Sequence, residues 1–177
     1  MPDLILFSVV SLRKLSPPFY QTTSIHIRVL SHEDSEAVAY LFEKSIEEGG
    51  ATGWDNNSVR DLIQTGGFGF VAEIRNTVIG ACIVLPAGED AEILNVATDL
   101  NHRRLGAAYI LLRSALSAAR SSGFNRMILE VADDNFAAKS LYNAFGFKKI
   151  GLRQAYYKRG TQAVDAQVLA LELKPSL

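Results

Sequence analysis

The sequence predicts an α/β fold in which a mixed central sheet is covered by helices on both faces. Short runs rich in apolar and β-branched residues alternate with stretches whose apolar residues recur at helical spacing. A strand, a long helix and another strand follow one another between residues 91 and 131, which is the arrangement of a βαβ crossover. With 177 residues, of which 48% are hydrophobic, the chain can bury a sizeable core. We expect one domain over residues 25–177.

An alternating strand and an amphipathic helix open this domain. Residues 25–29 alternate apolar and polar side chains, which predicts a half-buried strand. Ser31 and Asp34 have the spacing of a capping box, and the apolar residues that follow lie on one helical face. The helix is expected to end at Gly49, because glycine commonly follows the last helical turn.

A second helix and a β-hairpin come next. Ser58 is expected to begin the helix, with Asp61 at the capping-box position, and a pair of glycines ends it. Residues 68–75 and 78–85 are apolar, β-branched or aromatic, and the polar pair Asn76-Thr77 separates them. This pattern predicts an antiparallel hairpin.

The second half of the chain contains the crossover and a final strand pair. The expected elements are a strand at 91–98, a helix from Gly106 to Ser121, a strand at 127–131, a helix after Asn135, and strands at 148–157 and 167–173.

Composition narrows the classes of function. With 18 basic and 19 acidic side chains the formal charge is -1, so no overall field favours nucleic acid or an anionic membrane. The only cysteine, Cys82, lies in an apolar run and is expected to be a buried, inert thiol. The three histidines are scattered without metal-ligand spacing, so no metal is predicted. The absence of a disulfide framework suits a reducing cytoplasm.

Residues 1–24 differ from the rest and are expected to form a flexible extension. The apolar run from Leu4 to Val10 is far shorter than the roughly 20 residues of a membrane span, and no basic residue precedes it as in a signal peptide. Pro17-Pro18 interrupts regular structure.

The loop at residues 102–108 is a candidate anion site. It joins the end of a strand to the start of a helix, where unbonded N–H groups and the helix dipole favour a phosphate. Gly106 and Ala108 allow close approach to the backbone, and Arg103 and Arg104 add positive charge. The alternative is a tight turn with solvated arginines.

Glu130 is a candidate general base. Met127, Leu129 and Val131 share one face of their strand, so Glu130 lies on the other face, beside Ile128. A carboxylate among apolar neighbours suits proton transfer from an amine. The alternative is a structural glutamate in a hydrogen bond or ion pair.

Asn135 and Tyr142 form a third candidate. They are seven residues apart, which places them on one helical face about two turns from each other. With Ala138 between them, that face could accept a pantetheine arm and bring its sulfur to the Tyr142 hydroxyl, which could protonate a departing thiolate. The alternative is a tyrosine packed on the sheet.

These motifs resemble the GCN5-related N-acetyltransferase (GNAT) superfamily, whose acetyl-CoA motif Gln/Arg-x-x-Gly-x-Gly/Ala matches Arg103, Gly106 and Ala108. Within it, Leu94–Asp99, Leu129–Val131, the run from Asn135 to Phe147, and Tyr156-Tyr157 are similar to the bacterial ribosomal-protein-alanine N-acetyltransferases of the RimI type. The likeness covers residues 25–174.

The resemblance implies a mostly antiparallel sheet with a βαβ acetyl-CoA-binding core, and acetyl-CoA as donor. It makes Glu130 the base and Tyr142 the acid, with Glu92 in reserve as base. The residues that it assigns to acetyl-CoA are Val96, Ala97, Thr98, Arg104, Leu105, Gly106, Ala107, Ala108, Tyr109 and Asn135.

The implied acceptor is the N-terminal α-amine of a protein, a small-subunit ribosomal protein beginning with alanine. Ala155, where the type usually has Asn, and Val164, where it usually has Glu, depart from the pattern in the segment expected to cover the peptide. Two alternatives stay open, an acetyltransferase of a small-molecule amine and a non-catalytic acyl-CoA-binding module.

Overall fold

The computed structural model describes residues 24–46, 53–159 and 161–173. Its strands are β1 (His26–Val29), β2 (Phe68–Ile74), β3 (Thr77–Ala87), β4 (Asp90–Thr98), β5 (Arg126–Ala132), β6 (Lys148–Arg159) and β7 (Gln162–Glu172). Its α-helices are α1 (Ser35–Ile46), α2 (Asn56–Gln64), α3 (Ala107–Ser121) and α4 (Phe136–Ala144), with short 3-10 turns at His32–Asp34 and Leu100–His102. Apart from Ser24, the predicted extension lies outside the described residues.

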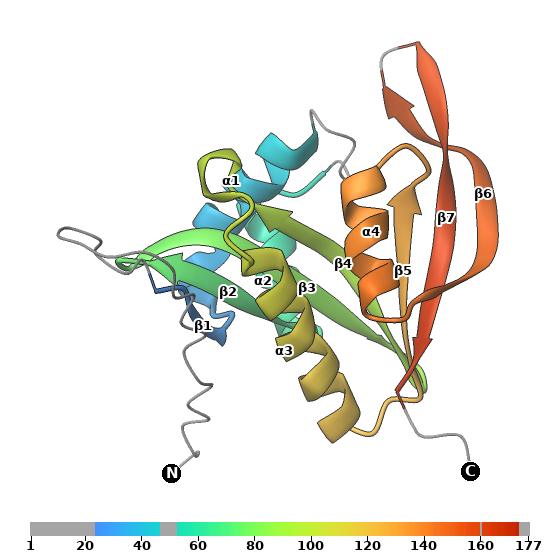
Figure 1. Ribbon diagram of the computed structural model, residues 1–177. Coiled ribbons are helices and arrows are strands. Elements are labelled where there is room, and N and C mark those ends of the chain that lie inside the picture. Colours follow the sequence, from blue (N-terminus) through green and yellow to red (C-terminus); the bar gives the residue numbers. More distant parts are fainter. Residues whose placement is uncertain (1–23, 47–52, 160, 174–177) are drawn as a thin grey trace, which may run out of the picture.

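The strands form one sheet in the order β1-β2-β3-β4-β5-β7-β6 (Figure 1). Every neighbouring pair is antiparallel except β4 and β5, which are parallel and are joined by α3 in a crossover. The predicted mixed and mostly antiparallel sheet is therefore confirmed. No helix in the described part of the chain is long and apolar enough to cross a membrane.

Helices cover both faces of the sheet, as predicted. On one face Leu111 and Leu112 of α3 are fully buried in the larger core, which also contains Met127 and Leu129 of β5. On the other face a smaller core joins α1 and α2 to the sheet, and Phe42 is fully buried there. The two cores fix the sheet between two layers of helices.

Two element boundaries differ from the prediction, and local conformation explains both. α2 begins at Asn56 rather than Ser58, because the Asp55 carboxylate caps it by accepting the Ser58 N–H at 2.7 Å. The hairpin turn is Arg75-Asn76, and both residues have positive φ, at 51° and 62°. A two-residue turn of this type needs left-handed residues, which Asn tolerates and the β-branched Thr77 does not.

The last two strands are longer than the prediction. β6 continues to Arg159 and β7 starts at Gln162, five residues before the expected position. Figure 1 shows them as a long ribbon at one edge of the sheet, next to β5 and α4. β7 pairs with β5 from Glu172 back to Ala166, so its first residues extend beyond β5.

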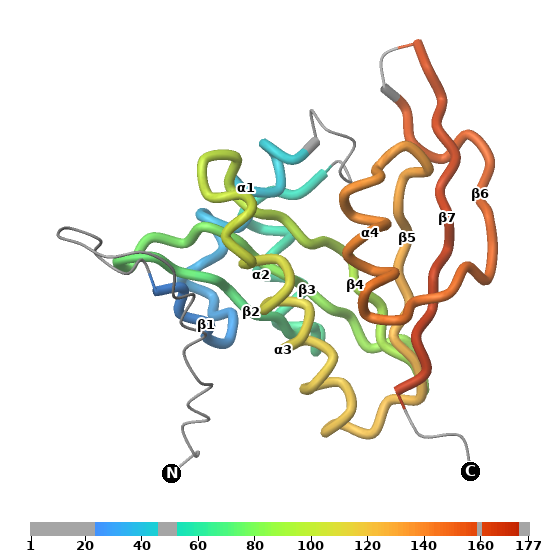
Figure 2. Tube along the Cα trace, viewed as in Figure 1, coloured from blue at the N-terminus to red at the C-terminus, as the bar shows by residue number. Residues whose placement is uncertain are grey.

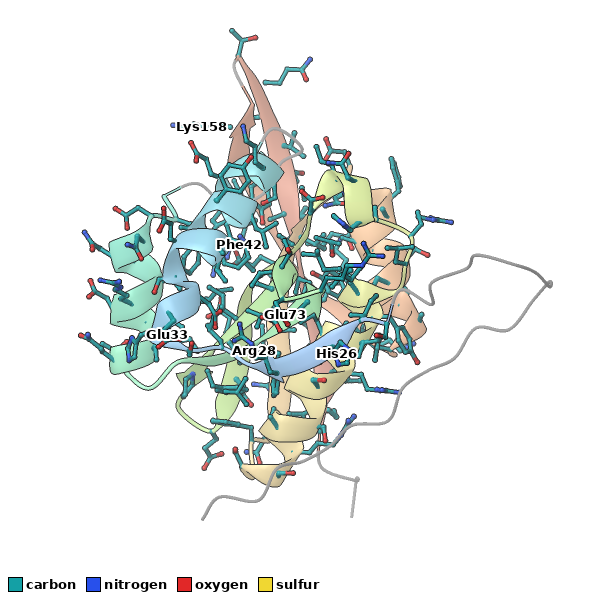
Figure 3. All side chains as sticks on the ribbon, turned by 90° about the vertical axis from the view of Figure 1, so that its left-hand side faces the viewer. His26, Arg28, Glu33, Phe42, Glu73 and Lys158 are labelled. Carbon is teal, nitrogen blue, oxygen red and sulfur yellow. The ribbon has the colours of Figure 1, made fainter. Side chains whose placement is uncertain are left out.

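An ion-pair cluster joins the first strand to the first helix. Both terminal nitrogens of Arg28 donate to the carboxylate of Asp34, at 2.7 and 2.6 Å, and Arg28 also contacts Glu73 on β2 (Figure 3). The Asp34 carboxylate accepts the N–H of Ser31 at 2.8 Å, which realises the predicted capping box. Burial alone would raise the pKa of Asp34, but the hydrogen bonds from Arg28 and Ser31 outweigh it and lower that pKa below its usual value.

Replacement of Asp34 by Asn should destabilise the fold near neutral pH by about 1–3 kcal/mol, because the neutral amide keeps only one of the two oxygens that accept from Arg28 and Ser31. Since the folded pKa of Asp34 is depressed, its contribution is present above the unfolded value of about 3.9 and is lost as pH falls through the folded pKa. Urea unfolding of wild type and D34N across acidic pH measures this: the two stabilities should converge in acid. A constant difference at all pH values would contradict it, and E33Q, at an exposed carboxylate in the same turn, is the control.

Candidate active site

The central feature of the site is a gap between β4 and β5. The two strands pair only at Ala91 with Met127, Glu92 with Ile128 and Ile93 with Leu129. Beyond these positions they diverge, β4 staying on β3 and β5 on β7 (Figure 2). The backbone edge of β4 past Ile93 is therefore unpaired on that side, and alternate N–H and C=O groups face the gap.

A β-bulge lies where the gap begins. Val84 on β3 pairs with Ile93 and Ile83 pairs with Asn95, so Leu94 is an additional residue on β4. A bulge bends its strand and increases the local twist. The bend at Leu94 thus coincides with the last β4–β5 pair and turns β4 away from β5.

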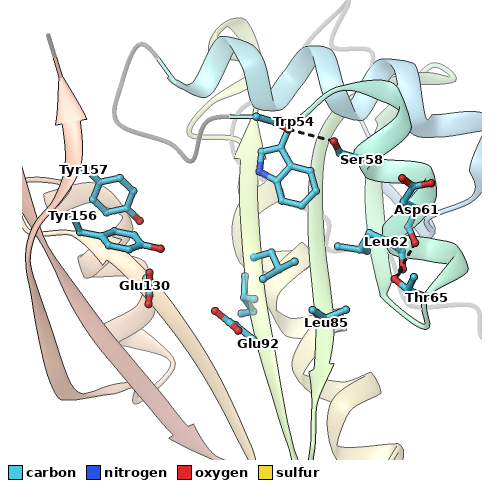
Figure 4. A pocket seen from close by; sticks show the side chains of 13 residues that line it. Trp54, Ser58, Asp61, Leu62, Thr65, Leu85, Glu92, Glu130, Tyr156 and Tyr157 are labelled. Atoms are coloured by element: carbon cyan, nitrogen blue, oxygen red, sulfur yellow. Dashed lines mark hydrogen bonds between the residues drawn. The ribbon is translucent and has the colours of Figure 1, made fainter.

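Two pockets meet at this gap. The α4 pocket lies toward α4, and its lining includes Asn95, Val96, Thr98, Asn135, Ala138 and Tyr142. The α2 pocket lies toward α2, and its lining includes Trp54, Ser58, Asp61, Glu92, Tyr156 and Tyr157 (Figure 4). Ile93, Leu94, Glu130 and Tyr157 line both pockets. Two ligands could therefore enter from opposite faces of the sheet and meet beside Glu130.

The α4 pocket brings together Asn135 and Tyr142, as the seven-residue spacing predicts. Asn135 caps α4 by accepting the Ala138 N–H through Oδ1 at 3.1 Å, which leaves its Nδ2 group as a donor. Tyr142 is only 7% exposed. Burial raises the pKa of Tyr142 above its usual value, and the nearby Cys82 and Tyr157 add to this. The hydroxyl therefore stays protonated and can serve as a proton donor.

The three predicted residues of β4, Val96, Ala97 and Thr98, also line the α4 pocket. Two buried polar atoms in this lining, Asn95 Nδ2 and Thr98 Oγ1, have no hydrogen-bond partner. Unpaired buried donors are costly, about 1–3 kcal/mol each. A ligand that carries carbonyl and amide groups could satisfy them, so the lining fits the arm of an acyl-CoA.

The start of α3 fits the anionic end of such a ligand. The first N–H bonded within the helix is that of Ile110, which donates to the Gly106 carbonyl at 3.1 Å, so the N–H groups of residues 106–109 have no partner in the helix. Gly106 is in the left-handed region at φ 89°, and no side chain caps the helix there. Among the loop residues singled out from the sequence, Arg103 lines the α4 pocket.

The remaining predicted residues of this segment lie around the helix start. Ala107 is buried, whereas Leu105 and Tyr109 are exposed. Arg104 adopts a positive φ of 63°, and the ring of Tyr109 packs on that of Phe145 at 4.6 Å. Arg104, Leu105, Ala107, Ala108 and Tyr109 are not part of the pocket lining itself, so a role for them depends on a ligand that extends past it.

Glu130 differs from the expected isolated carboxylate among apolar neighbours. Its Oε1 lies 2.7 Å from Nε of Arg153, and its side chain is 13% exposed. The Tyr156 hydroxyl lies beside Glu130 (Figure 4), and its interaction with that carboxylate, with partial burial, raises the pKa of Tyr156. Thus Glu130 has the ion pair of the structural alternative and also lies where the two pockets meet.

Glu92 is the second carboxylate of the site. It pairs across β4 and β5 with Ile128, two residues before Glu130, so both glutamates line the α2 pocket. Burial raises the pKa of Glu92, and the negative charge of Glu130 raises it further, while Arg153 partly offsets the effect. Of the two glutamates, Glu92 was the weaker candidate from the sequence.

Sequence reasoning missed two residues of the site: Trp54, which lines the α2 pocket, and Arg153, which contacts Glu130. Trp54 borders the α2 pocket and packs edge-on against Phe42 at 5.4 Å, and the sequence predicted no role for it. Arg153 gave no signal, because its contact with Glu130 depends on the conformation of β6. Cys82 is fully buried, and burial raises its pKa to about 12, so it is inert as predicted.

Across residues 24–46, 53–159 and 161–173, no group of three His, Cys, Asp or Glu side chains has the geometry of a metal site.

Comparison with known proteins places this site in a family. Human N-acetyltransferase 8 is 32% identical over 96 residues, 51% of this chain and 42% of that protein. The ribosomal protein bS18-alanine N-acetyltransferase of Escherichia coli K12 is 31% identical over 85 residues, 48% of this chain and 57% of that protein. The chain thus spans about half the length of these curated relatives.

Solved structures share the fold. The ribosomal-protein-S18-alanine N-acetyltransferase from Escherichia coli superimposes with a TM-score of 0.77 at 22% identity, covering 86% of this chain and 96% of that one. The Salmonella typhimurium protein yncA, solved with its cofactor acetyl-CoA, gives 0.74 at 17% identity, with 86% and 95% coverage. Residues 28–147 match the model of the acetyltransferase (GNAT) family. The chain therefore belongs to the GNAT family of acetyltransferases.

Proposed function

We propose that this protein transfers the acetyl group of acetyl-CoA directly to the N-terminal α-amine of a protein. The observation that carries the proposal is the meeting of two pockets at the β4–β5 gap, with Glu130 lining both. The α4 pocket would bind the acetyl donor, and the α2 pocket, which is lined by several carboxylates, would bind the amine. Direct transfer needs both reactants in one place, and such positioning accounts for much of the acceleration when the thioester is already activated.

The donor would lie along β4 and the start of α3. The free N–H groups of residues 106–109, with Arg103 and Arg104, would hold the pyrophosphate. The unpaired edge of β4 at Val96–Thr98 would bond the pantetheine arm, and Asn135 Nδ2 would complete that site. Backbone N–H groups near Val96 would stabilise the oxyanion.

Proton transfer would involve Glu130 and Tyr142 on the two sides of the gap. Glu130 would take the proton of the attacking amine, directly or through water, and Tyr142 would protonate the CoA thiolate. Glu92 is the second candidate for the base, and its raised pKa favours it, because a carboxylate with a higher pKa holds a proton more readily.

The acceptor proposed is a small-subunit ribosomal protein with N-terminal alanine. The similarity to the Escherichia coli relative, whose name includes that activity, supports it. A small-molecule amine is the second candidate, because the carboxylates and rings of Glu92, Glu130, Trp54, Tyr156 and Tyr157 would also receive a compact cation. A non-catalytic module is disfavoured by the presence of both Glu130 and Tyr142 at the gap.

The proposal is tested by CoA release from acetyl-CoA with a panel of amines. Peptides beginning with alanine, including Ala-Arg, should be acetylated, whereas the same peptides with a blocked N-terminus should not. Turnover on spermidine or an aminoglycoside, and on none of the peptides, would show that the acceptor is a small-molecule amine instead of a protein N-terminus. Tight acetyl-CoA binding without turnover would favour the non-catalytic module.

Tyr142→Phe should lower kcat by about 10²-fold or more, because the thiolate loses its proton donor, while acetyl-CoA affinity stays nearly the same. Steady-state kinetics and calorimetric titration with acetyl-CoA measure the two quantities. Y40F, at an exposed tyrosine on α1, is the matched control and should behave as wild type. Unchanged turnover of Y142F would remove Tyr142 from the mechanism.

The base is identified by the pH dependence of turnover. Because a base must be ionised, turnover should rise with pH on the acidic side of its pH profile, and removal of the base should abolish or shift that rise. We expect E130Q to change the acidic side of the profile more than E92Q does. The opposite order would assign the proton transfer to Glu92, and an unchanged profile in both variants would assign it to water.

A further inference from the structure

The outer strand β6 is irregular opposite Asp165. Arg153 pairs with Ala166, and the next pair is Tyr157 with Val164. Three residues of β6, 154–156, therefore face the single residue Asp165 of β7. Such a bulge changes the direction in which the following side chains point.

A side chain and a backbone conformation hold this bulge. The N–H of Ala155 donates to Oδ1 of Asp165 at 2.8 Å, and Ala155 has a positive φ of 52°. The left-handed region is unfavourable for a residue with a Cβ, so the hydrogen bond that Asp165 accepts offsets a strained backbone. The carbonyl of Asp165 accepts the N–H of Asp133 at 2.8 Å, which ties the bulge to the end of β5.

The bulge brings two side chains of β6 to one carboxylate. In a regular strand, residues three apart point to opposite faces. Here Arg153 and Tyr156 both contact Glu130, the first through Nε at 2.7 Å and the second through its hydroxyl. The guanidinium of Arg153 also lies over the Tyr156 ring, 5.3 Å from its centre. The three side chains thus form one cluster that spans from β6 across β7 to β5.

We propose that Arg153 is a positioning residue for acetyl transfer, which, with Tyr156, holds the Glu130 carboxylate at the gap between β4 and β5. The inference rests on the proposed function. A glutamate side chain has several rotatable bonds, and the charge of Glu92 in the same pocket repels it. Contacts from two side chains of a bulge that Asp165 holds restrict that freedom. Active-site groups need this kind of support to stay within a fraction of an ångström of the productive geometry.

The competing explanation is an ion pair that serves stability alone. Exposed ion pairs contribute little to the free energy of unfolding, and the side chain of Arg153 is 57% exposed. The chain contains a matched pair for comparison. Arg126, 42% exposed on the same strand as Glu130, lies 2.7 Å from Asp90 and lines neither the α4 nor the α2 pocket. If the ion pair only stabilises the fold, replacing either arginine should have a similar effect on kcat. If Arg153 positions Glu130, only replacement of Arg153 should lower kcat.

The test compares Arg153→Gln and Arg153→Lys with the control Arg126→Gln, using the best acceptor of the amine panel. R153Q should lower kcat by roughly 10- to 100-fold, with KM for acetyl-CoA within about twofold of wild type, because the base is misplaced while the donor site is intact. R153K should lie between R153Q and wild type, since lysine keeps the charge but lacks the planar N–H group. R126Q should have the kcat of wild type.

A double-mutant cycle on the free energy of unfolding, with E130Q and R153Q, measures the Arg153–Glu130 contact without reference to turnover. The inference is refuted by a zero coupling in this cycle, by a wild-type kcat in R153Q, or by equal kinetic losses in R153Q and R126Q. Absence of turnover by the wild-type protein with every amine would instead refute the proposed function, and the inference with it, while leaving the contact measurable in the cycle.

Discussion

The site depends on one interruption of backbone pairing, the end of the β4–β5 ladder at Ile93 and Leu129. A sheet that stayed paired would have no passage from one face to the other, because each strand would satisfy its neighbour. The additional residue Leu94 ends the pairing, and the two cores hold β4 on β3 and β5 on β7 beyond it. The cost is a row of unpaired peptide groups along β4. These groups are also the ones that can bind an extended ligand.

Charge at this gap is arranged asymmetrically. The α2 pocket is lined by Asp61, Glu92 and Glu130, and Arg153 pairs with only one of them. A neutral amine must form from its ammonium ion before it can attack, and nearby carboxylates both attract the cation and accept its proton. On the other face, Tyr142 is buried with its proton retained. The carboxylates and the protonated hydroxyl therefore lie on opposite sides of the gap, which is the arrangement that the proposed transfer from amine to thiolate needs.

Features governed by local sequence could be predicted, and features governed by distant pairing could not. The spacing of Asn135 and Tyr142 is fixed by one helix, and the alternation that turns Glu130 away from Leu129 is fixed by one strand. Arg153 meets Glu130 only through the register of β6 on β7 and a bulge. The predictions for the turn at Arg75-Asn76 and for the start of α2 at Asn56 were wrong by one or two residues, because several polar residues near each boundary could serve. The alanine at position 155 was noticed as a departure, but its left-handed backbone could not be read from the sequence.

Ala155 links the backbone strain of β6 to the placement of side chains beside the α2 pocket. Asn and Gly tolerate the left-handed region better than Ala does, so Ala155 leaves strain in the strand that borders the α2 pocket. The Asp165 side chain opposes the strain by binding the Ala155 N–H. Any change in β6 that relaxes the bulge would move Arg153 and Tyr156 together, since both depend on it for their direction. The orientation of Glu130 is therefore coupled, through the backbone of an edge strand, to the segment of β6 that lines the α2 pocket. Variation in this segment can alter the lining of that pocket and the placement of the carboxylate at once, while β4 and the start of α3 stay unchanged.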